Sequence, residues 1–379
     1  MDCVHFGRCG GCTYLDINYS DELNMKLNTL KETLGNYGDM VTSILPSPNE
    51  KGYRNKMELA FGDEGKDGLL ALGIRKKRSF YEVATPTDCV LIPEDFRRIT
   101  MYVLEYFRNA GETFFHRKRH TGALRHLVLR RGEFTGEVLV NLSHASTLKA
   151  PLSPLVEGLK NLELEGKLVG VLHTVNDGVA DAVKNENTTI LWGQDYYNEE
   201  ICGLKFKVSA YSFFQTNSAG AEVLYGVVQD YAAGTDGDLA YDLYCGTGTI
   251  AQILSPQFKK VMGIEIIADA IEAAKDNAAL NGISNCEFFA GDVNVKLSGG
   301  NPGLIVVDPP RNGLHPKALL KVLEIKPQWL IYVACKPESL ARDMIEFTAA
   351  GYEVKKIQGV DMFPRTPHVE CVALMSRRK

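Results

Sequence analysis

The second half of the chain alternates short apolar stretches with longer stretches of helical periodicity, and this pattern limits the fold more than any other feature of the sequence. Such alternation predicts a parallel sheet covered by helices, an α/β fold. The last two apolar stretches are separated only by residues 364–367, which is too short for a parallel crossover, so we expect an antiparallel hairpin there. The expected strands are residues 239–245, 260–266, 285–293, 303–308, 329–335, 352–363 and 368–377.

The first half is expected to be a separate, strand-rich α+β domain. Residues 124–131 and 137–142 predict a β-hairpin around a turn that contains two glycines. A chain of 379 residues, 45% of them apolar, is long enough for two cores. A change of pattern near residue 200 predicts two domains, residues 1–200 and residues 201–379.

Composition and charge narrow the class of protein. The sequence has neither a basic leader followed by an apolar run nor an apolar stretch long enough for a bilayer, so a cytoplasmic monomer without membrane contact is expected. Nine cysteines without a secretion signal favour reduced thiols, catalysis or metal binding. A net charge of -5 argues against non-specific coating of nucleic acid, so any RNA site must be local. Two basic stretches, residues 75–78 and 116–131, are either solvated surface or a phosphate-contacting groove.

A glycine turn follows the first expected strand of the second domain. Gly246 and Gly248 let the backbone approach a ligand closely, but residue 251 is alanine, so the dinucleotide pattern is incomplete. Glu265 ends the next strand, 19 residues after Gly246, near the spacing at which an acid binds ribose hydroxyls. We therefore expect an adenosine-type ligand, with Asp292 at the same edge; the alternative role for Glu265 is to cap the following helix.

The chemistry is expected where the next strands end. Asp308 and Cys335 follow two neighbouring strands, and Glu370 opens the last antiparallel strand, so all three should share the edge at which α/β sheets bind ligands. A lone cysteine is more often a buried apolar side chain. Beside Lys336 and the start of the helix at 337–350, however, we expect a lowered thiol pKa.

These residues resemble the RNA uracil-C5 methyltransferases over nearly the whole chain. The resemblance rests on four motifs, at residues 53–56, 212–217, 242–246 and 368–370. It implies that Gln215, Tyr244, Glu265 and Asp308 contact S-adenosylmethionine, that Cys335 is the nucleophile and that Glu370 accepts a proton. Around the nucleophile the family usually reads Ser-Cys-Asn-Pro, whereas this chain has Ala-Cys-Lys-Pro.

A cysteine and a carboxylate suit carbon methylation of uracil. Thiolate addition at carbon 6 would activate carbon 5, and a base would then remove the carbon 5 proton. The alternative enzyme is an amino-group methyltransferase that uses Asp308 and the two prolines after it, but nitrogen needs no covalent adduct, which leaves Cys335 and Glu370 without a role. A non-enzymatic, metal-stabilised RNA-binding module is the third alternative.

Four cysteines in the first half form a candidate metal site. Cys3, Cys9 and Cys12 lie among glycines, and Cys89 is the fourth. Four thiolates fit an iron–sulfur cluster or structural zinc, and spacing does not choose between them; unligated buried thiols are the remaining alternative. The resemblance favours [4Fe-4S]. The Cys-x3-Cys-x2-Cys pattern of radical S-adenosylmethionine enzymes is absent.

The expected partner is RNA with a looped or flipped-out uracil. The chain begins at the cysteine motif, without the oligonucleotide-binding barrel of some relatives. This pattern, a cysteine cluster without a barrel, is most similar to the enzymes for 23S ribosomal RNA, and we expect that substrate. Transfer RNA is the alternative.

Overall fold

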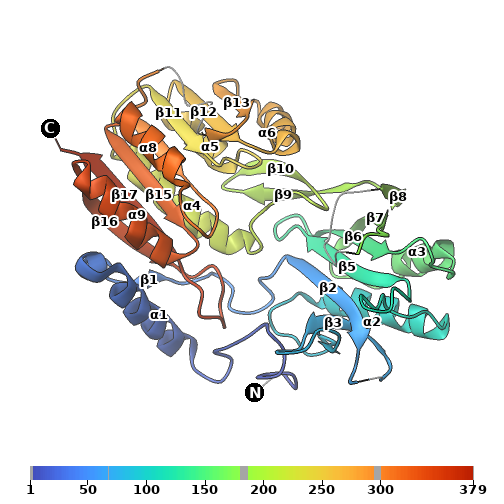
Figure 1. The fold of residues 1–379 in the computed structure, drawn as a ribbon. Coiled ribbons are helices and arrows are strands. Elements are labelled where there is room, and N and C mark those ends of the chain that lie inside the picture. Colours follow the sequence, from blue (N-terminus) through green and yellow to red (C-terminus); the bar gives the residue numbers. More distant parts are fainter. Residues whose placement is uncertain (1–2, 67, 180–186, 294–299, 379) are drawn as a thin grey trace.

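The computed structural model describes residues 3–66, 68–179, 187–293 and 300–378. Its C-terminal half is built on a sheet in which eight described strands are ordered β1-β16-β17-β15-β14-β11-β12-β13 (Figure 1). Strands β11 to β15 are parallel, and β17 is antiparallel to both β15 and β16. The predicted parallel sheet and its terminal antiparallel hairpin are thus confirmed. The strands are β1 (Ile44–Leu45), β11 (Leu239–Leu243), β12 (Lys260–Glu265), β13 (Cys286–Ala290), β14 (Leu304–Val307), β15 (Trp329–Ala334), β16 (Tyr352–Val360) and β17 (Glu370–Arg377).

Helices cover both faces of this sheet because its central strands are apolar on both sides. In β14, Leu304 and Val306 pack into one core, whereas Ile305 and Val307 pack into the other. The first core is closed by α4 (Ser218–Ala233), α5 (Thr249–Leu254) and α6 (Ala268–Leu280). The second is closed by α1 (Tyr19–Leu34), α8 (Pro316–Ile325) and α9 (Pro337–Ala349). Two 3-10 turns, η1 (Gly35–Met40) and η2 (Ser255–Gln257), follow α1 and α5.

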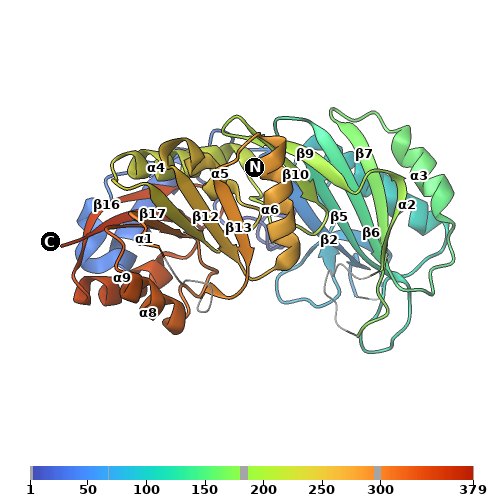
Figure 2. The same ribbon diagram turned by 90° about the horizontal axis from the view of Figure 1, so that it is seen from above.

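A second sheet lies in the N-terminal half, with its described strands ordered β4-β3-β2-β5-β6-β7-β8 (Figure 2). The expected hairpin is its centre, since β5 pairs antiparallel with β6. Helix α2 packs on one face through Phe96, Ile99, Val103 and Phe107, which recur at helical spacing. The elements are β2 (Lys56–Asp63), β3 (Leu70–Arg75), β4 (Val83–Ala84), α2 (Glu94–Asn109), β5 (Leu124–Arg131), β6 (Glu137–His144), α3 (Leu152–Lys160), β7 (Lys167–Val175) and β8 (Thr188–Gly193), followed by the hairpin β9 (Tyr196–Ile201) and β10 (Leu204–Ser209).

Helix α1 and strand β1 do not join the N-terminal sheet. Strand β1 pairs in parallel with β16, Ile44 opposite Gly359, and Leu30 of α1 lies in the core under the C-terminal sheet. Residues 19–45 therefore pack on the half of the molecule that carries the last strand. The division at residue 200 stays a prediction.

None of the helices in the described part of the chain combines the length and the apolar character that crossing a membrane requires.

Candidate active site

One edge of the C-terminal sheet gathers the polar residues singled out in the sequence. Leu243 of β11 pairs with Ile264 of β12 and with Val307 of β14, so Tyr244, Glu265 and Asp308 all lie at the ends of their strands at that edge. Ala334 of β15 pairs with Cys371 of β17, and extending this register by one residue places Cys335 opposite Glu370. Two residues 35 positions apart in the sequence are thus cross-strand neighbours.

Glu370 is a buried acid whose pKa is raised to about 8, first by burial and then by the negative charge of Asp308. Its side chain is 4% exposed. Burial also raises the pKa of half-buried Asp308 to about 7. Because both pKa values lie near neutral pH, each acid is suited to take up or release a proton during a reaction.

Cys335 contradicts the expectation of a lowered thiol pKa, which was wrong. Its pKa is raised to about 11 by burial and then by the charges of Glu370 and Asp308, and Arg311 opposes these effects only in part. Lys336 is exposed and stands as the N-cap of α9 without a side-chain capping bond. Burial and two nearby acids therefore outweigh the helix N-terminus and the adjacent lysine.

The glycine turn and Glu265 are joined directly. The backbone N–H of Gly246 donates to Glu265 Oε2 at 3.3 Å, and the N–H of Ile267 donates to Oε1 at 3.0 Å. Tyr244 and Gly246 both have positive φ, 65° and 52°, and a Cβ added at Gly246 would meet no atom within 4 Å. The turn thus leaves open space beside a carboxylate, which can accept ligand hydroxyls. Glu265 precedes helix α6 and bonds near its start, so it also fulfils part of the capping role.

Asp242 is a candidate ligand contact that the sequence reasoning missed. Its Oδ2 accepts the N–H of Ala251 at 2.9 Å, but its fully buried Oδ1 has no hydrogen-bond partner among the described residues. Burial raises its pKa well above the ordinary value. A buried acceptor without a partner at this edge fits a polar ligand group or an ordered water. Its place in the glycine motif was the only available signal.

Gln215 is held from the other half of the molecule. The side-chain amide of Asn55 donates to the Gln215 carbonyl at 3.2 Å and to Ser218 Oγ at 2.8 Å. Asn217 caps helix α4, because its Oδ1 accepts the N–H of Gly220 at 2.9 Å. The Gln215 side chain bonds to the hydroxyl of buried Tyr225, whose pKa is raised by burial and then by the charge of Asp308. The motifs at residues 53–56 and 212–217 thus contact each other, and this contact places Gln215 near Asp308.

The two phenylalanines before Gln215 have different environments. Phe213 is 73% exposed, whereas Phe214 is 5% exposed and packs against Phe206. Of these two rings, only Phe213 presents its surface to solvent and is available for stacking on a base.

The loop from residue 361 to 367, which leads into Glu370, is fixed by a buried ion network. Lys26 Nζ lies 2.8 Å from Glu22 Oε1 and 2.7 Å from Asp361 Oδ1, and all three side chains are almost completely buried. The N–H of Arg365 donates to Glu22 Oε1 at 2.7 Å. The hydroxyl of Tyr53 donates to the Pro364 carbonyl at 2.9 Å. Helix α1 thereby holds the loop that positions the buried acid.

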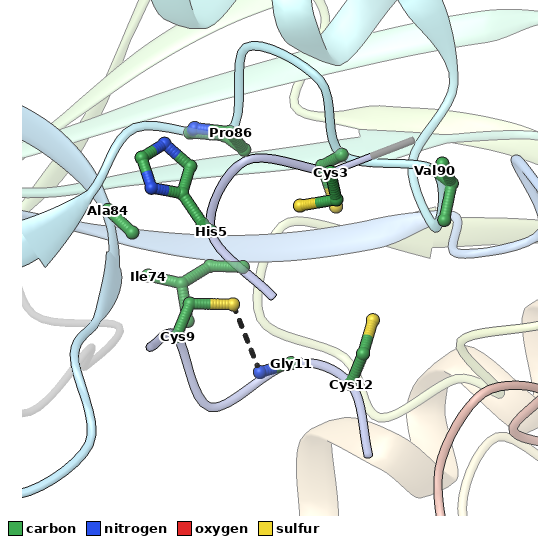
Figure 3. A pocket seen from close by; sticks show the side chains of 10 residues that line it. Cys3, His5, Cys9, Gly11, Cys12, Ile74, Ala84, Pro86 and Val90 are labelled. Carbon is green, nitrogen blue, oxygen red and sulfur yellow. Dashed lines mark hydrogen bonds between the residues drawn. The ribbon is translucent and has the colours of Figure 1, made fainter. Parts of the chain in front are cut away.

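Cys3, Cys9, Cys12 and Cys89 line one small pocket, with a cavity volume of about 20 Å³. Figure 3 shows the sulfurs of Cys3, Cys9 and Cys12 directed into the space between them, and Cys9 Sγ accepts the N–H of Gly11 at 3.4 Å. Burial and, after it, the other three thiols raise the pKa of Cys12 to about 12. Within the described residues, no three His, Cys, Asp or Glu side chains are placed to hold a metal ion. The four cysteines are therefore gathered, but the structure shows no metal centre.

Asp292, the remaining expected ligand contact, follows β13 at the same edge. Its charge acts on Tyr244, whose pKa is raised mainly by burial. The sequence-predicted residues of the C-terminal half are thus brought together at one edge, whereas the four cysteines form a separate group in the N-terminal half.

Comparison with known proteins gives consistent results. Residues 172–298 and 289–378 match the model of the tRNA (uracil-5-)-methyltransferase family. An RNA methyltransferase of Caldanaerobacter subterraneus subsp. tengcongensis is 44% identical over 99% of this chain and 84% of the relative. An RNA methyltransferase of Clostridium tetani is 43% identical over the same shares of the two chains. Among solved structures, the tRNA (uracil-54, C5)-methyltransferase of Pyrococcus abyssi in complex with S-adenosyl-L-homocysteine has a TM-score of 0.80 and 30% identity, and it covers 97% of this chain and 86% of its own.

Proposed function

Because this chain belongs to the tRNA (uracil-5-)-methyltransferase family, we propose that it methylates carbon 5 of a uracil in RNA through a covalent adduct between Cys335 and carbon 6. The observation that carries this mechanism is that Cys335 and Glu370 each lie next to the last residue pair of β15 and β17, and that the charges of Glu370 and Asp308 both act on Cys335. A nucleophile and a buried acid at one strand end are what adduct formation and proton removal need.

The residues at the sheet edge fit S-adenosylmethionine. Glu265 suits the ribose hydroxyls, the open space at Gly246 admits the ligand close to the backbone, and the unpartnered Asp242 oxygen offers a further acceptor. We assign Gln215, Tyr244, Asp292 and Asp308 to the same ligand. When bound, the cofactor supplies an electrophilic methyl group. The Pyrococcus abyssi structure with S-adenosyl-L-homocysteine supports this assignment.

Cys335 and Glu370 act before and after methyl transfer. The Cys335 sulfur forms a bond to carbon 6, and the electron pair displaced from the ring double bond makes carbon 5 nucleophilic. Once carbon 5 carries the methyl group, Glu370 takes its proton, the double bond returns and the bond from sulfur to carbon 6 breaks. The raised pKa of Glu370 suits this role, because a stronger base removes a carbon-bound proton more readily.

We further propose that the four cysteines bind a [4Fe-4S] cluster rather than zinc. The grouping of all four around one pocket supports a shared ligand. A single zinc ion would need four sulfurs at about 2.3 Å from one point. In a four-iron cluster each thiolate binds a different iron, so the sulfurs lie farther apart. The family resemblance described above favours the cluster over zinc.

The proposed substrate is 23S ribosomal RNA, with a uracil that lies in a loop or is flipped out. The cysteine motif and the resemblance described above support it. The family name and the Pyrococcus abyssi enzyme make transfer RNA the specific alternative.

The test is mass mapping of methyluridines in ribosomal and transfer RNA from cells with and without the gene. We expect one 5-methyluridine of 23S ribosomal RNA to disappear and to return with the wild-type gene, but not with Cys335→Ala. Loss from transfer RNA alone would replace the substrate assignment. Unchanged 5-methyluridine in both RNAs, together with loss of a methylated amino group, would contradict the proposed reaction.

A further inference from the structure

The two basic stretches of the N-terminal half, 40 residues apart in sequence, lie side by side in the fold. Residues 75–78 form the turn between β3 and β4, and residues 116–120 form a loop before β5. The loop is closed by a hydrogen bond from the N–H of His116 to the Thr121 carbonyl at 2.7 Å. The rings of Tyr81 and His116 stack with centroids 4.3 Å apart, which joins the turn to the loop.

The loop that carries Cys3, Cys9 and Cys12, here called the cysteine loop, adds a third segment to the same surface. Cys9 forms a β-bridge with Lys76, and the N–H of Lys77 donates to the Arg8 carbonyl at 2.9 Å. Arg8 therefore lies beside the turn at residues 75–78.

These three segments expose cations and one large aromatic ring together. Phe80 is 77% exposed, the highest value among the large hydrophobic side chains of the described residues. Five of the exposed cations are Arg8, Lys77, Arg78, Lys118 and Arg119. We call these six residues the basic turn surface. Lys76 is not included, because it pairs with Glu82 at 3.4 Å. The whole chain has a net charge of -5, so this cluster of positive charge differs from the overall charge of the protein.

We propose that the basic turn surface is a second RNA contact, which binds backbone phosphates and one unpaired base away from the target uracil. This inference rests on the proposed function, because it takes RNA as the substrate. Cations around an exposed aromatic ring suit single-stranded or looped RNA, since the charges hold phosphates and the ring stacks on a base. Phe80 supplies the stacking ring of this surface.

One RNA molecule can reach both places. The chain from Arg8 to Thr13 covers five residues, and the N–H of Thr13 donates to the Arg365 carbonyl at 2.8 Å. From Arg365 to Glu370 is another five residues. At no more than about 3.6 Å per residue, the two segments together span at most roughly 36 Å. The cysteine loop thus connects the basic turn surface with the loop that positions Glu370.

The test compares two variants with the same change of charge. In the surface variant, Lys77, Arg78, Lys118 and Arg119 are replaced by Gln. In the control, four exposed lysines of the C-terminal half are replaced by Gln: Lys259, Lys275, Lys326 and Lys355. The probes are a labelled hairpin RNA with a uridine-containing loop and a duplex RNA of equal length.

Loss of four phosphate contacts should lower the slope of log affinity against log salt by about 3. Between 50 and 200 mM salt, hairpin binding by the wild-type protein should therefore weaken roughly 50- to 150-fold more than binding by the surface variant. The control should follow the wild type. Phe80→Ala should weaken hairpin binding about fivefold or more at every salt concentration, with an unchanged slope and little effect on the duplex.

If the surface variant and the control have equal slopes of log affinity against log salt, the proposal is wrong. It is also wrong if Phe80→Ala weakens binding of the hairpin and of the duplex equally. Cofactor binding should be unchanged in all three variants, which shows that the proteins are folded. Failure of the proposed function gives a different result: wild-type protein that binds the hairpin with the expected slope but methylates no uracil in any RNA.

Discussion

The buried acid Glu370 should make decay of the covalent adduct depend steeply on pH. With a pKa of about 8, about one Glu370 in eleven is ionised at pH 7 and about ten in eleven at pH 9. Only the ionised form can take the proton from carbon 5. If this proton transfer limits the release of methylated RNA, the decay rate should rise about tenfold from pH 7 to pH 9, with a midpoint near 8.

The assay is a rapid-quench experiment in a single turnover, with a methyl-labelled cofactor and substrate RNA. Denaturing gels separate the labelled protein–RNA adduct from released RNA, so formation and decay of the adduct are followed separately. This separation matters because the pKa of Cys335, about 11, makes adduct formation rise with pH as well. Glu370→Gln should form the adduct and retain it across the whole range.

A matched pair of variants tests why the pKa of Glu370 is raised. Asp308→Asn removes the charge that raises the pKa of Glu370 after burial, so the midpoint should move to lower pH, while burial keeps it above the ordinary value. Glu338→Gln removes an exposed acid from the first turn of α9 and should leave the midpoint in place. A pH-independent decay rate, or release of methylated RNA by Glu370→Gln at the wild-type rate, would refute Glu370 as the base.

Three further predictions concern the nucleophile, the cysteine pocket and the buried network. Cys335 should react with iodoacetamide at pH 7 roughly 300-fold more slowly than an unperturbed cysteine, because its pKa is about 11 rather than about 8.5; rates measured by mass spectrometry that match a cysteine peptide would contradict this. Anaerobically purified protein should be brown and contain iron and sulfide, and Cys89→Ser should bleach it; colourless protein with stoichiometric zinc would overturn the cluster assignment. Lys26→Met should lower the free energy of unfolding by about 3–5 kcal/mol in denaturant titrations, because it leaves buried Asp361 without its cation and buried Glu22 with only Arg365, 3.6 Å away. Lys275→Met, which breaks an exposed pair, should cost less than about 1 kcal/mol; equal losses would show that the buried network does not stabilise the fold.

The positions of the site residues could be predicted from the sequence because they follow from strand order. Once the strands are parallel, Tyr244, Glu265 and Asp308 must lie at one edge. Antiparallel pairing of the last strand then brings Glu370 to Cys335. The order and direction of the strands determine where these residues lie, and both follow from the alternation of apolar and helical stretches. The details of side-chain packing are not needed.

The electrostatics of the site could not be predicted in the same way. The pKa of Cys335 depends on burial and on acids from two other strands, whereas its sequence neighbours indicated only Lys336 and a helix start. Asp242 and Tyr225 were missed for a related reason, since an unpartnered oxygen and a buried hydroxyl are visible only when their surroundings are known. The pairing of β1 with β16 likewise joins segments more than 300 residues apart, and two residues of strand carry no periodic signal.

The bond between Lys26 and Asp361 has a consequence for the order in which the chain folds. The two residues are 335 positions apart, so at about 5–20 residues per second a ribosome makes Asp361 roughly 17 to 67 s after Lys26. Until then Lys26 of helix α1 lacks the second of its two carboxylate partners. Glu370, which opens β17, is synthesised later still. Assembly of the base is thus a late event in folding, and a nascent chain that already contains Cys335 still lacks the group proposed to release the methylated RNA.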